Sequence, residues 1–113
     1  MEKNEIGKQG EDQASAFLKK NRFKIIERNY RTRFGEIDVI ARDGPTIVFV
    51  EVKLRNTAEF GSPLAAVDRR KQEKLRRMAA SYLQKKGLYD RIPARFDVLG
   101  ITPDGIEHIK NAF

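Results

Sequence analysis

Two neighbouring segments carry acidic and basic side chains at a spacing that could bind a metal ion and hydrolyse a phosphodiester. Residues 35–41 read GEIDVIA, and residues 46–54 read TIVFVEVKL. Because side chains of a strand alternate between its two faces, Glu51 and Lys53 share a face with the apolar residues that begin their strand. An ordinary surface strand is polar along one whole face. Here the two charged groups stand at the end of a row whose first residues are hydrophobic, which is typical of a functional site.

The turn between these segments decides whether their acids meet. Asp43-Gly44-Pro45 predicts a turn, so residues 36–54 are expected to form a β-hairpin. Antiparallel partners have a constant sum of residue numbers, and Asp38 and Glu51 share a face in the register whose sum is 89. Paired carboxylates form the hard oxygen site that Mg²⁺ prefers. Lys53 could then orient a metal-bound water and offset charge that builds up on a phosphate.

Two further charged residues lie on the apolar stripes of predicted helices. Glu11 precedes Ala14 by three positions, and Lys71 precedes Leu75 by four. Charged groups on a core-facing stripe are costly unless they are paired or belong to a site. Two interpretations of each stay open. Glu11 is a metal ligand or an acid favoured by a helix N-terminus, and Lys71 contacts phosphate or extends its ammonium from the core edge into solvent.

The order of predicted elements indicates how these residues are positioned. We expect a first helix over 4–21 and strands over 23–30, 36–41 and 46–54. A long second helix then begins at the N-cap Ser62 and ends just before Gly87, with a possible kink where Asp68 could cap a fresh start. Strands over 94–101 and 106–110 close the chain. The strands are bunched between two helices, which favours a mixed sheet flanked by helices over a doubly wound sheet. The fold class is therefore mixed α+β (α/β). Without a linker or repeat, residues 1–113 are expected to form a single domain.

Composition narrows the classes of function. The chain has 23 Lys and Arg against 16 Asp and Glu, a net charge of +7, which favours a polyanionic partner. It has no cysteine, which excludes disulfides, thiolate nucleophiles and cysteine-ligated zinc, and its one histidine, His108, leaves little room for a Ser-His-Asp triad. No apolar segment suits a signal peptide or a membrane span. We expect a cytoplasmic protein without a membrane partner.

Cationic residues flank the acidic segments in sequence. The candidates for nucleic-acid binding are Arg31, Arg33, Arg55, Arg69, Arg70, Lys71 and Lys74. A ring of cations around an acidic cluster would hold phosphates near a bound metal. The alternative is that the cations of the second helix are only its solvated face.

The same residues carry a resemblance to a known family. Asp38, a turn and Glu51-Val52-Lys53 resemble the PD-(D/E)xK nuclease signature, although Ile37 stands in place of its proline. Together with FGSPLAAVDRRKQEKL downstream, the chain more specifically resembles the YraN-like family of uncharacterised bacterial proteins, predicted endonucleases distantly related to Holliday junction resolvases. The resemblance covers most of the chain, from Gly10 to Val98. It implies a restriction-endonuclease-like core.

The resemblance also implies roles for individual residues. Asp38 and Glu51 would be metal ligands with Glu11 as a third, and Lys53 would be the catalytic lysine. We expect Glu36 either to support the metal ligands without binding the ion or to be exposed. We assign no role to the strand residues Asp97 and His108.

The expected function is that of a Mg²⁺-dependent (or Mn²⁺-dependent) endonuclease acting on the phosphodiesters of DNA, with branched or junction DNA among the substrates considered. The alternative is a catalytically inactive nucleic-acid-binding module with the same fold, and a third reading is a basic adaptor for an anionic protein. The sequence leaves open whether the substrate is a junction, flap, nick, duplex or RNA. It also leaves the oligomeric state open, although cleavage of a four-way junction would favour a homodimer.

Overall fold

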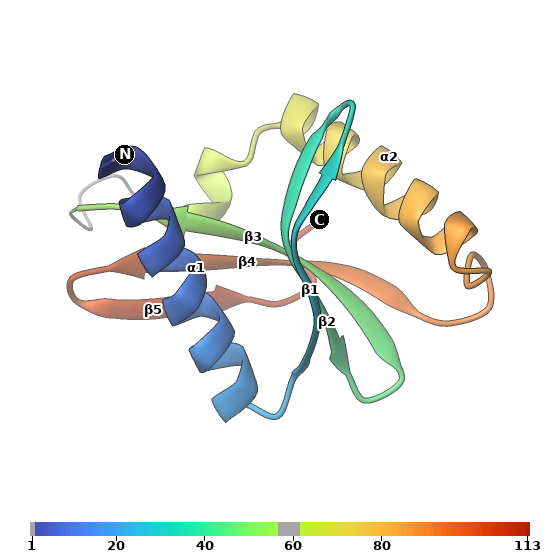
Figure 1. The fold of residues 1–113 in the computed structure, drawn as a ribbon, viewed down its shortest axis with the longest axis horizontal. Helices are drawn as coiled ribbons and strands as arrows, with labels where there is room; N and C mark the ends of the chain where they lie inside the picture. The colour runs from blue at the N-terminus through green and yellow to red at the C-terminus, as the bar shows by residue number, and fades with distance from the viewer. Residues whose placement is uncertain (1, 57–61) are drawn as a thin grey trace.

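The computed structural model describes residues 2–56 and 62–113, whose elements follow the predicted order (Figure 1). They are α1 Glu2–Lys20, β1 Lys24–Thr32, β2 Gly35–Asp43, β3 Thr46–Leu54, the 3₁₀ helix η2 Pro63–Ala66, α2 Arg69–Lys85, β4 Ala94–Thr102 and β5 Gly105–Ile109. The predicted mixed α+β class is confirmed. The arrangement is compatible with a restriction-endonuclease-like core.

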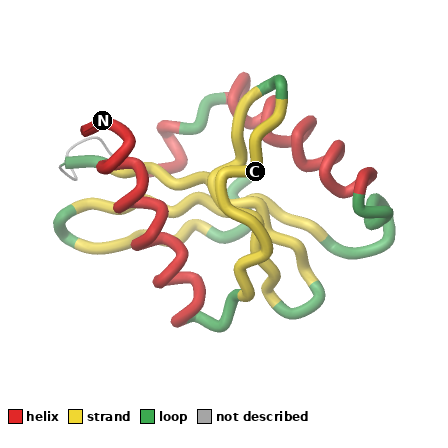
Figure 2. Tube along the Cα trace, viewed as in Figure 1, coloured by secondary structure: helices red, strands yellow, loops and turns green. Residues whose placement is uncertain are grey.

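The five strands form one sheet in the order β1-β2-β3-β4-β5. Three of the neighbouring pairs are antiparallel, and β3 with β4 is parallel, because the chain crosses over through η2 and α2 between them. The predicted mixed sheet is therefore confirmed. In Figure 2 the strands lie between the two long helices.

Each long helix packs on its own face of the sheet, and alternate residues of β3 show how. Val48 and Val50 belong to a buried cluster with Leu18 of α1. Phe49 points to the opposite face, where its ring lies edge-on to Tyr82 of α2, with 5.9 Å between ring centroids. The residues of β3 that continue the Phe49 row, Glu51 and Lys53, therefore come out on the α2 side.

The second helical segment is divided near Asp68, where the sequence suggested a fresh start. Ser62 caps only the short helix η2, where its side chain accepts a hydrogen bond from the Leu64 N–H at 3.2 Å. Asp68 caps α2 in turn, accepting from the Lys71 N–H at 2.9 Å. A carboxylate at an N-cap satisfies backbone donors that the helix leaves unpaired, so each segment begins on its own cap. In the described ranges, no helix is long and apolar enough to cross a membrane.

Candidate metal centre

The β2–β3 hairpin pairs in the predicted odd-sum register. Partners run from Asp43 opposite Thr46 to Val39 opposite Val50, and every pair sums to 89. The ladder ends at Val39 and Val50. One residue further on, the Asp38 Oδ2 atom accepts a hydrogen bond from the Val52 N–H at 2.8 Å. A carboxylate thus takes the place of a backbone carbonyl at the end of the ladder.

The residue of β1 opposite Asp38 is distorted. Asn29 lies between two regular pairs, Arg28 with Val39 and Tyr30 with Ile37, and has a φ of 54°. Asparagine tolerates this left-handed conformation better than most residues. Its Nδ2 donates to the Glu11 Oε2 atom at 2.8 Å. Asn29 therefore connects α1 to the sheet at the acidic site, a role that its type and place in the sequence did not signal.

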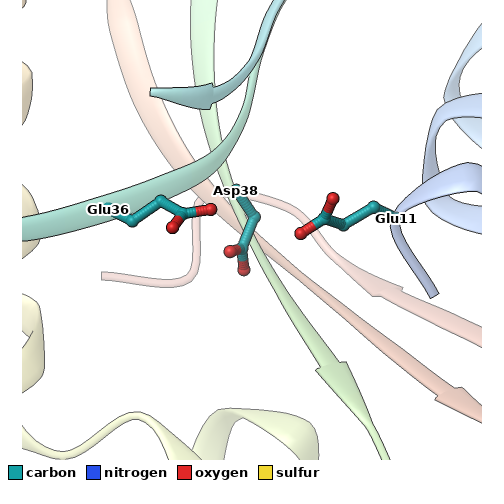
Figure 3. A group of neighbouring side chains, drawn as sticks. All are labelled: Glu11, Glu36 and Asp38. Carbon is teal, nitrogen blue, oxygen red and sulfur yellow. The ribbon is translucent and has the colours of Figure 1, made fainter. Parts of the chain in front are cut away.

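Three carboxylates converge at this point. Glu11 of α1 and Glu36 and Asp38 of β2 each offer one oxygen, and these oxygens lie within 4.8 Å of one another. Figure 3 shows Glu11 and Glu36 pointing toward Asp38 from opposite sides. We call these three residues the acidic triplet. Glu36, which we expected to be supporting or exposed, is half-buried and belongs to this cluster. The signal was its place two residues before Asp38 on one strand, which puts both on one side.

Glu51, the other predicted metal ligand, lies beside the triplet with different partners. Its side chain is buried (4% exposed), and its Oε2 atom lies 3.5 Å from Lys53 Nζ and 3.3 Å from Lys71 Nζ. Among the described residues, Glu51 is not part of the acidic triplet. Lys71 extends its ammonium to Glu51 and not only into solvent. The structure therefore brings Asp38, Glu51 and Lys53 together, and adds Lys71 from α2.

Electrostatics within the site favour a bound cation. Burial, with the nearby Glu51 and Glu36 carboxylates, raises the pKa of Asp38 to about 8, although the Val52 N–H opposes this. Burial and the neighbouring like charges thus disfavour the ionised form of Asp38 in the metal-free protein. A divalent cation would relieve the same crowding of negative charge.

The donor set also suits such an ion. The triplet offers only carboxylate oxygens, which Mg²⁺ and Mn²⁺ prefer. Next to it, the Asn29 Oδ1 atom is buried and has no hydrogen-bond partner among the described residues. The residues present therefore fit a hard divalent cation with its water ligands.

The structure separates the two interpretations of Glu11. Helix α1 begins at Glu2, so Glu11 lies more than two turns beyond the N-terminus. The field of a helix terminus acts within about the first turn, so the explanation based on the helix N-terminus is wrong. Glu11 is instead half-buried against Asn29, with Arg28 NH2 at 3.9 Å from its Oε2 atom.

The predicted nucleic-acid-binding residues fall into two groups. One group is exposed and consists of Arg31, Arg33, Arg55, Arg69, Arg70 and Lys74. Within it, Arg31 Nε lies 3.7 Å from the Glu36 Oε2 atom and so borders the acidic triplet. The other group is Lys71 alone, held at Glu51.

A second charged group, which the sequence did not indicate, is buried on β4. Asp97 is fully buried and accepts hydrogen bonds from Arg95 Nε at 2.9 Å and from the Asn111 N–H at 3.0 Å, with His108 Nε2 at 2.7 Å. Burial alone would raise the pKa of Asp97, but these hydrogen bonds outweigh it and lower the pKa. Asp97 and His108 are thus not ordinary strand residues, because they tie the C-terminal residues to the sheet.

Comparison with known proteins places the chain in a family. Residues 10–101 match the family described as Uncharacterised protein family UPF0102. A UPF0102 protein of Geobacter sulfurreducens is 51% identical over 113 residues, covering 96% of this chain and 88% of the relative. One from Thermodesulfovibrio yellowstonii is 47% identical and covers 100% of this chain and 99% of the relative, and one from Moorella thermoacetica is 44% identical with 100% and 98% covered. The chain belongs to the UPF0102 family.

Proposed function

We propose that this protein is a Mg²⁺- or Mn²⁺-dependent endonuclease that hydrolyses phosphodiester bonds of DNA, with branched or junction DNA among its substrates. One observation carries the proposal: the carboxylates of Glu11, Glu36 and Asp38 converge beside the Glu51–Lys53 pair. They come from the adjacent strands β2 and β3 and from α1, which precedes the sheet in the sequence. A surface acidic patch would not need a buried glutamate held between two lysines.

The acidic triplet would hold the ion, with Glu51 beside it. A divalent cation bound there supplies Lewis acidity and lowers the pKa of a coordinated water. The Val52 N–H fixes the Asp38 carboxylate at the end of the strand ladder, so that this group needs little rearrangement on binding. Positioning of this kind contributes much of the catalysis in phosphoryl-transfer enzymes.

Lys53 acts on the reacting phosphate in this proposal. Its ammonium lies 3.5 Å from Glu51 and is about one-fifth exposed, so it is held in place yet within reach of a substrate. There it would orient the attacking water and stabilise the negative charge that develops on the phosphate oxygens. Lys71 keeps Glu51 paired when Lys53 turns toward the substrate, because its Nζ lies 3.3 Å from the same oxygen.

The exposed arginines and lysines would hold the DNA backbone. The net charge of +7 and the position of Arg31 next to Glu36 support this role. Phosphate contacts of this kind are independent of sequence and weaken steeply as salt displaces them. We therefore expect binding that depends on salt and changes little with base sequence.

The test is a cleavage assay on a panel of DNA substrates with Mg²⁺, with Mn²⁺ and with EDTA. The panel contains a four-way junction, a flap, a nicked duplex and an intact duplex of one sequence, with an RNA duplex as a further arm. Metal-dependent cleavage by the parent and none by Asp38→Asn supports the proposal. Salt-sensitive binding without cleavage of any substrate would instead identify the inactive binding module. No binding at low salt would favour the basic adaptor.

A further inference from the structure

The tip of the β1–β2 hairpin exposes an aromatic ring next to a cation. Phe34 is 46% exposed and is one of three large hydrophobic residues exposed in the described chain, with Ile26 and Tyr89. The Arg33 guanidinium carbon lies 4.8 Å from the centroid of the Phe34 ring. Neither residue is needed for the core, since both project from a turn. An exposed aromatic paired with arginine is typical of a binding surface.

The turn that presents Phe34 is fixed in place. The Thr32 hydroxyl oxygen accepts from the Phe34 N–H at 3.0 Å and donates to the Gly35 carbonyl at 3.1 Å. Gly35 has a φ of 143°, which side-chain-bearing residues rarely adopt, and a methyl group built on it would lie 3.8 Å from the Met78 methyl carbon of α2. The hairpin tip therefore rests on α2. A ring held in this way loses little entropy when a ligand stacks on it.

Beside this contact, a cavity of about 400 Å³ is lined by residues of both the hairpin tip and α2. Its lining consists of Thr32, Arg33, Phe34, Met78, Ser81 and Lys85. This lining combines an aromatic ring, a thioether, two hydroxyls and two cations, and none of its members is acidic. The chemistry matches a nucleotide, whose base has an apolar face and whose phosphate is anionic. A peptide partner for the same cavity would have to combine an apolar group with an acidic one.

From this juxtaposition we propose that Phe34 stacks on an unpaired base of the DNA, while Arg33 and Lys85 contact the phosphates next to it. This inference rests on the proposed nuclease function and names its substrate class: DNA with unpaired nucleotides close to the bond that is cut. A base inside a duplex has both faces stacked, so it cannot use the ring. An unpaired base at a branch or in a single-stranded arm has a free face that can stack on the Phe34 ring.

The Phe34 ring and the acidic triplet lie close enough for one DNA molecule to contact both. Phe34 lies four residues before Asp38 on the same hairpin, which corresponds to roughly 13 Å of extended chain at about 3.3 Å per residue. Successive phosphates of a B-form strand rise by about 3.4 Å. The ring and the acidic triplet are therefore separated by the length of a few nucleotides, so we expect the unpaired segment to lie close to the cut.

The test measures binding without metal, so that it does not depend on cleavage. Affinity is measured by fluorescence anisotropy, in EDTA, for a DNA duplex and for a duplex of the same length that ends in two unpaired arms. We expect the parent to bind the splayed DNA more tightly. We expect Phe34→Ala to reduce binding of the splayed DNA on the order of tenfold, and to change binding of the intact duplex by less than twofold.

Matched variants separate stacking from other effects of the substitution. Phe34→Trp should retain the preference for unpaired arms, whereas Phe34→Leu, which keeps an apolar side chain without a π-face, should lose it. Tyr89→Ala removes a similarly exposed ring (48%) outside the cavity lining and should leave the preference unchanged. A fluorescent 2-aminopurine placed at successive arm positions should be quenched by the parent at one position and not by Phe34→Leu.

The results that would overturn this inference also show whether the nuclease proposal fails with it. If Phe34→Ala weakens binding of the duplex and of the splayed DNA equally, Phe34 is only a general contact. The same holds if Phe34→Leu keeps the preference for unpaired arms. Neither result affects metal-dependent cleavage. If the parent binds neither DNA at low salt, both the stacking site and the nuclease proposal are lost. If the parent cuts duplex and splayed DNA equally well, only the stacking site is lost.

Discussion

The Asp38 carboxylate accepts a hydrogen bond from the Val52 N–H at 2.8 Å, one residue beyond the last regular pair of β2 and β3. This contact explains why an acid can be partly buried at a strand end. Its side chain satisfies a backbone donor that the ladder leaves open, at the cost of burying a carboxyl group. The same contact directs Asp38 toward Glu51 and the two other carboxylates of the acidic triplet.

The raised pKa of Asp38 makes the metal-free protein less stable as pH rises. Burial and the neighbouring acids raise its pKa from 3.8 to about 8 on folding, so between these values the folded state holds a proton that the unfolded state has lost. The free energy of unfolding therefore falls as pH increases through this window. Asp38→Asn, which keeps an oxygen for Val52, should remove this dependence and be the more stable protein at pH 8, by on the order of 1 kcal/mol or more.

Urea unfolding in EDTA at several pH values between 5 and 8 measures this difference. Asp104→Asn, an exposed residue of the β4–β5 turn, is the matched control and should follow the parent. A parent that gains stability relative to Asp38→Asn as pH rises would contradict the assignment.

Loss of Glu11 should weaken the response to metal and not the fold. Glu11→Gln keeps an oxygen to accept from Asn29 Nδ2, so the α1–β1 contact survives. It removes one of three anionic oxygens, and affinity for a hard cation depends on how many charged ligands it has. We expect Mg²⁺ or Mn²⁺ affinity to fall about tenfold or more.

The increase in melting temperature as metal is added reports this affinity. Asp12→Asn is the matched control, because Asp12 is the next residue on α1 and pairs with Arg28 at 2.6 Å outside the triplet. An unchanged metal response in Glu11→Gln would remove Glu11 from the site.

Lys53 and Lys71 should act on stability together, because both pair with one buried oxygen of Glu51. Either Lys53→Met or Lys71→Met leaves one ammonium in place. The double variant leaves a buried carboxylate without a cation, which is much more costly. We expect the double variant to lose on the order of 1 kcal/mol more than the sum of the single variants.

A double-mutant cycle by urea unfolding measures this coupling. Lys53→Met combined with Lys74→Met is the control cycle, since Lys74 is exposed on the same helix. The control should be additive. Additivity in the Lys53–Lys71 cycle as well would mean that the two ammoniums do not share Glu51 in solution.

Much of the fold could be predicted because its signals are local. The alternation along β2 and β3 and the turn at Gly44-Pro45 together set the register, and that register was confirmed. The cap at Asp68 likewise marked the start of α2. In each case neighbouring residues in the sequence are also neighbours in space, so propensity and pattern point to the same answer.

The rest of the site depends on contacts that no local pattern encodes. Asn29 has a left-handed φ because it lies opposite Asp38 and bonds to α1, and both partners are distant in sequence. Lys71 was on an apolar stripe in the sequence, but its partner Glu51 became evident only once α2 was packed on the sheet. Tertiary packing, not spacing, creates these two contacts.

Asp97 should matter for stability and not for metal binding. It is fully buried with Arg95 and His108 as partners, so Asp97→Asn should destabilise the protein by about 3 kcal/mol or more. Because its pKa is lowered on folding, its contribution is present above the unfolded value and is lost as pH falls below about 4.

Thermal melts with and without Mg²⁺ test this. Asp43→Asn is the control, since Asp43 pairs with the same Arg95 at 2.9 Å but is partly exposed, and its loss should cost less. The rise in melting temperature with metal should be the same in both variants and in the parent. A lost metal response in Asp97→Asn would contradict a purely structural role.

The cleavage rate of site variants that remain folded tests the account most directly. Asp38→Asn, Glu51→Gln and Lys53→Ala are purified alongside the parent, shown to be folded by circular dichroism, and compared on one branched DNA with saturating Mn²⁺ or Mg²⁺. We predict metal-dependent cleavage by the parent and a loss on the order of a hundredfold or more in each variant. Equal cleavage by the parent and all three variants would contradict the nuclease site.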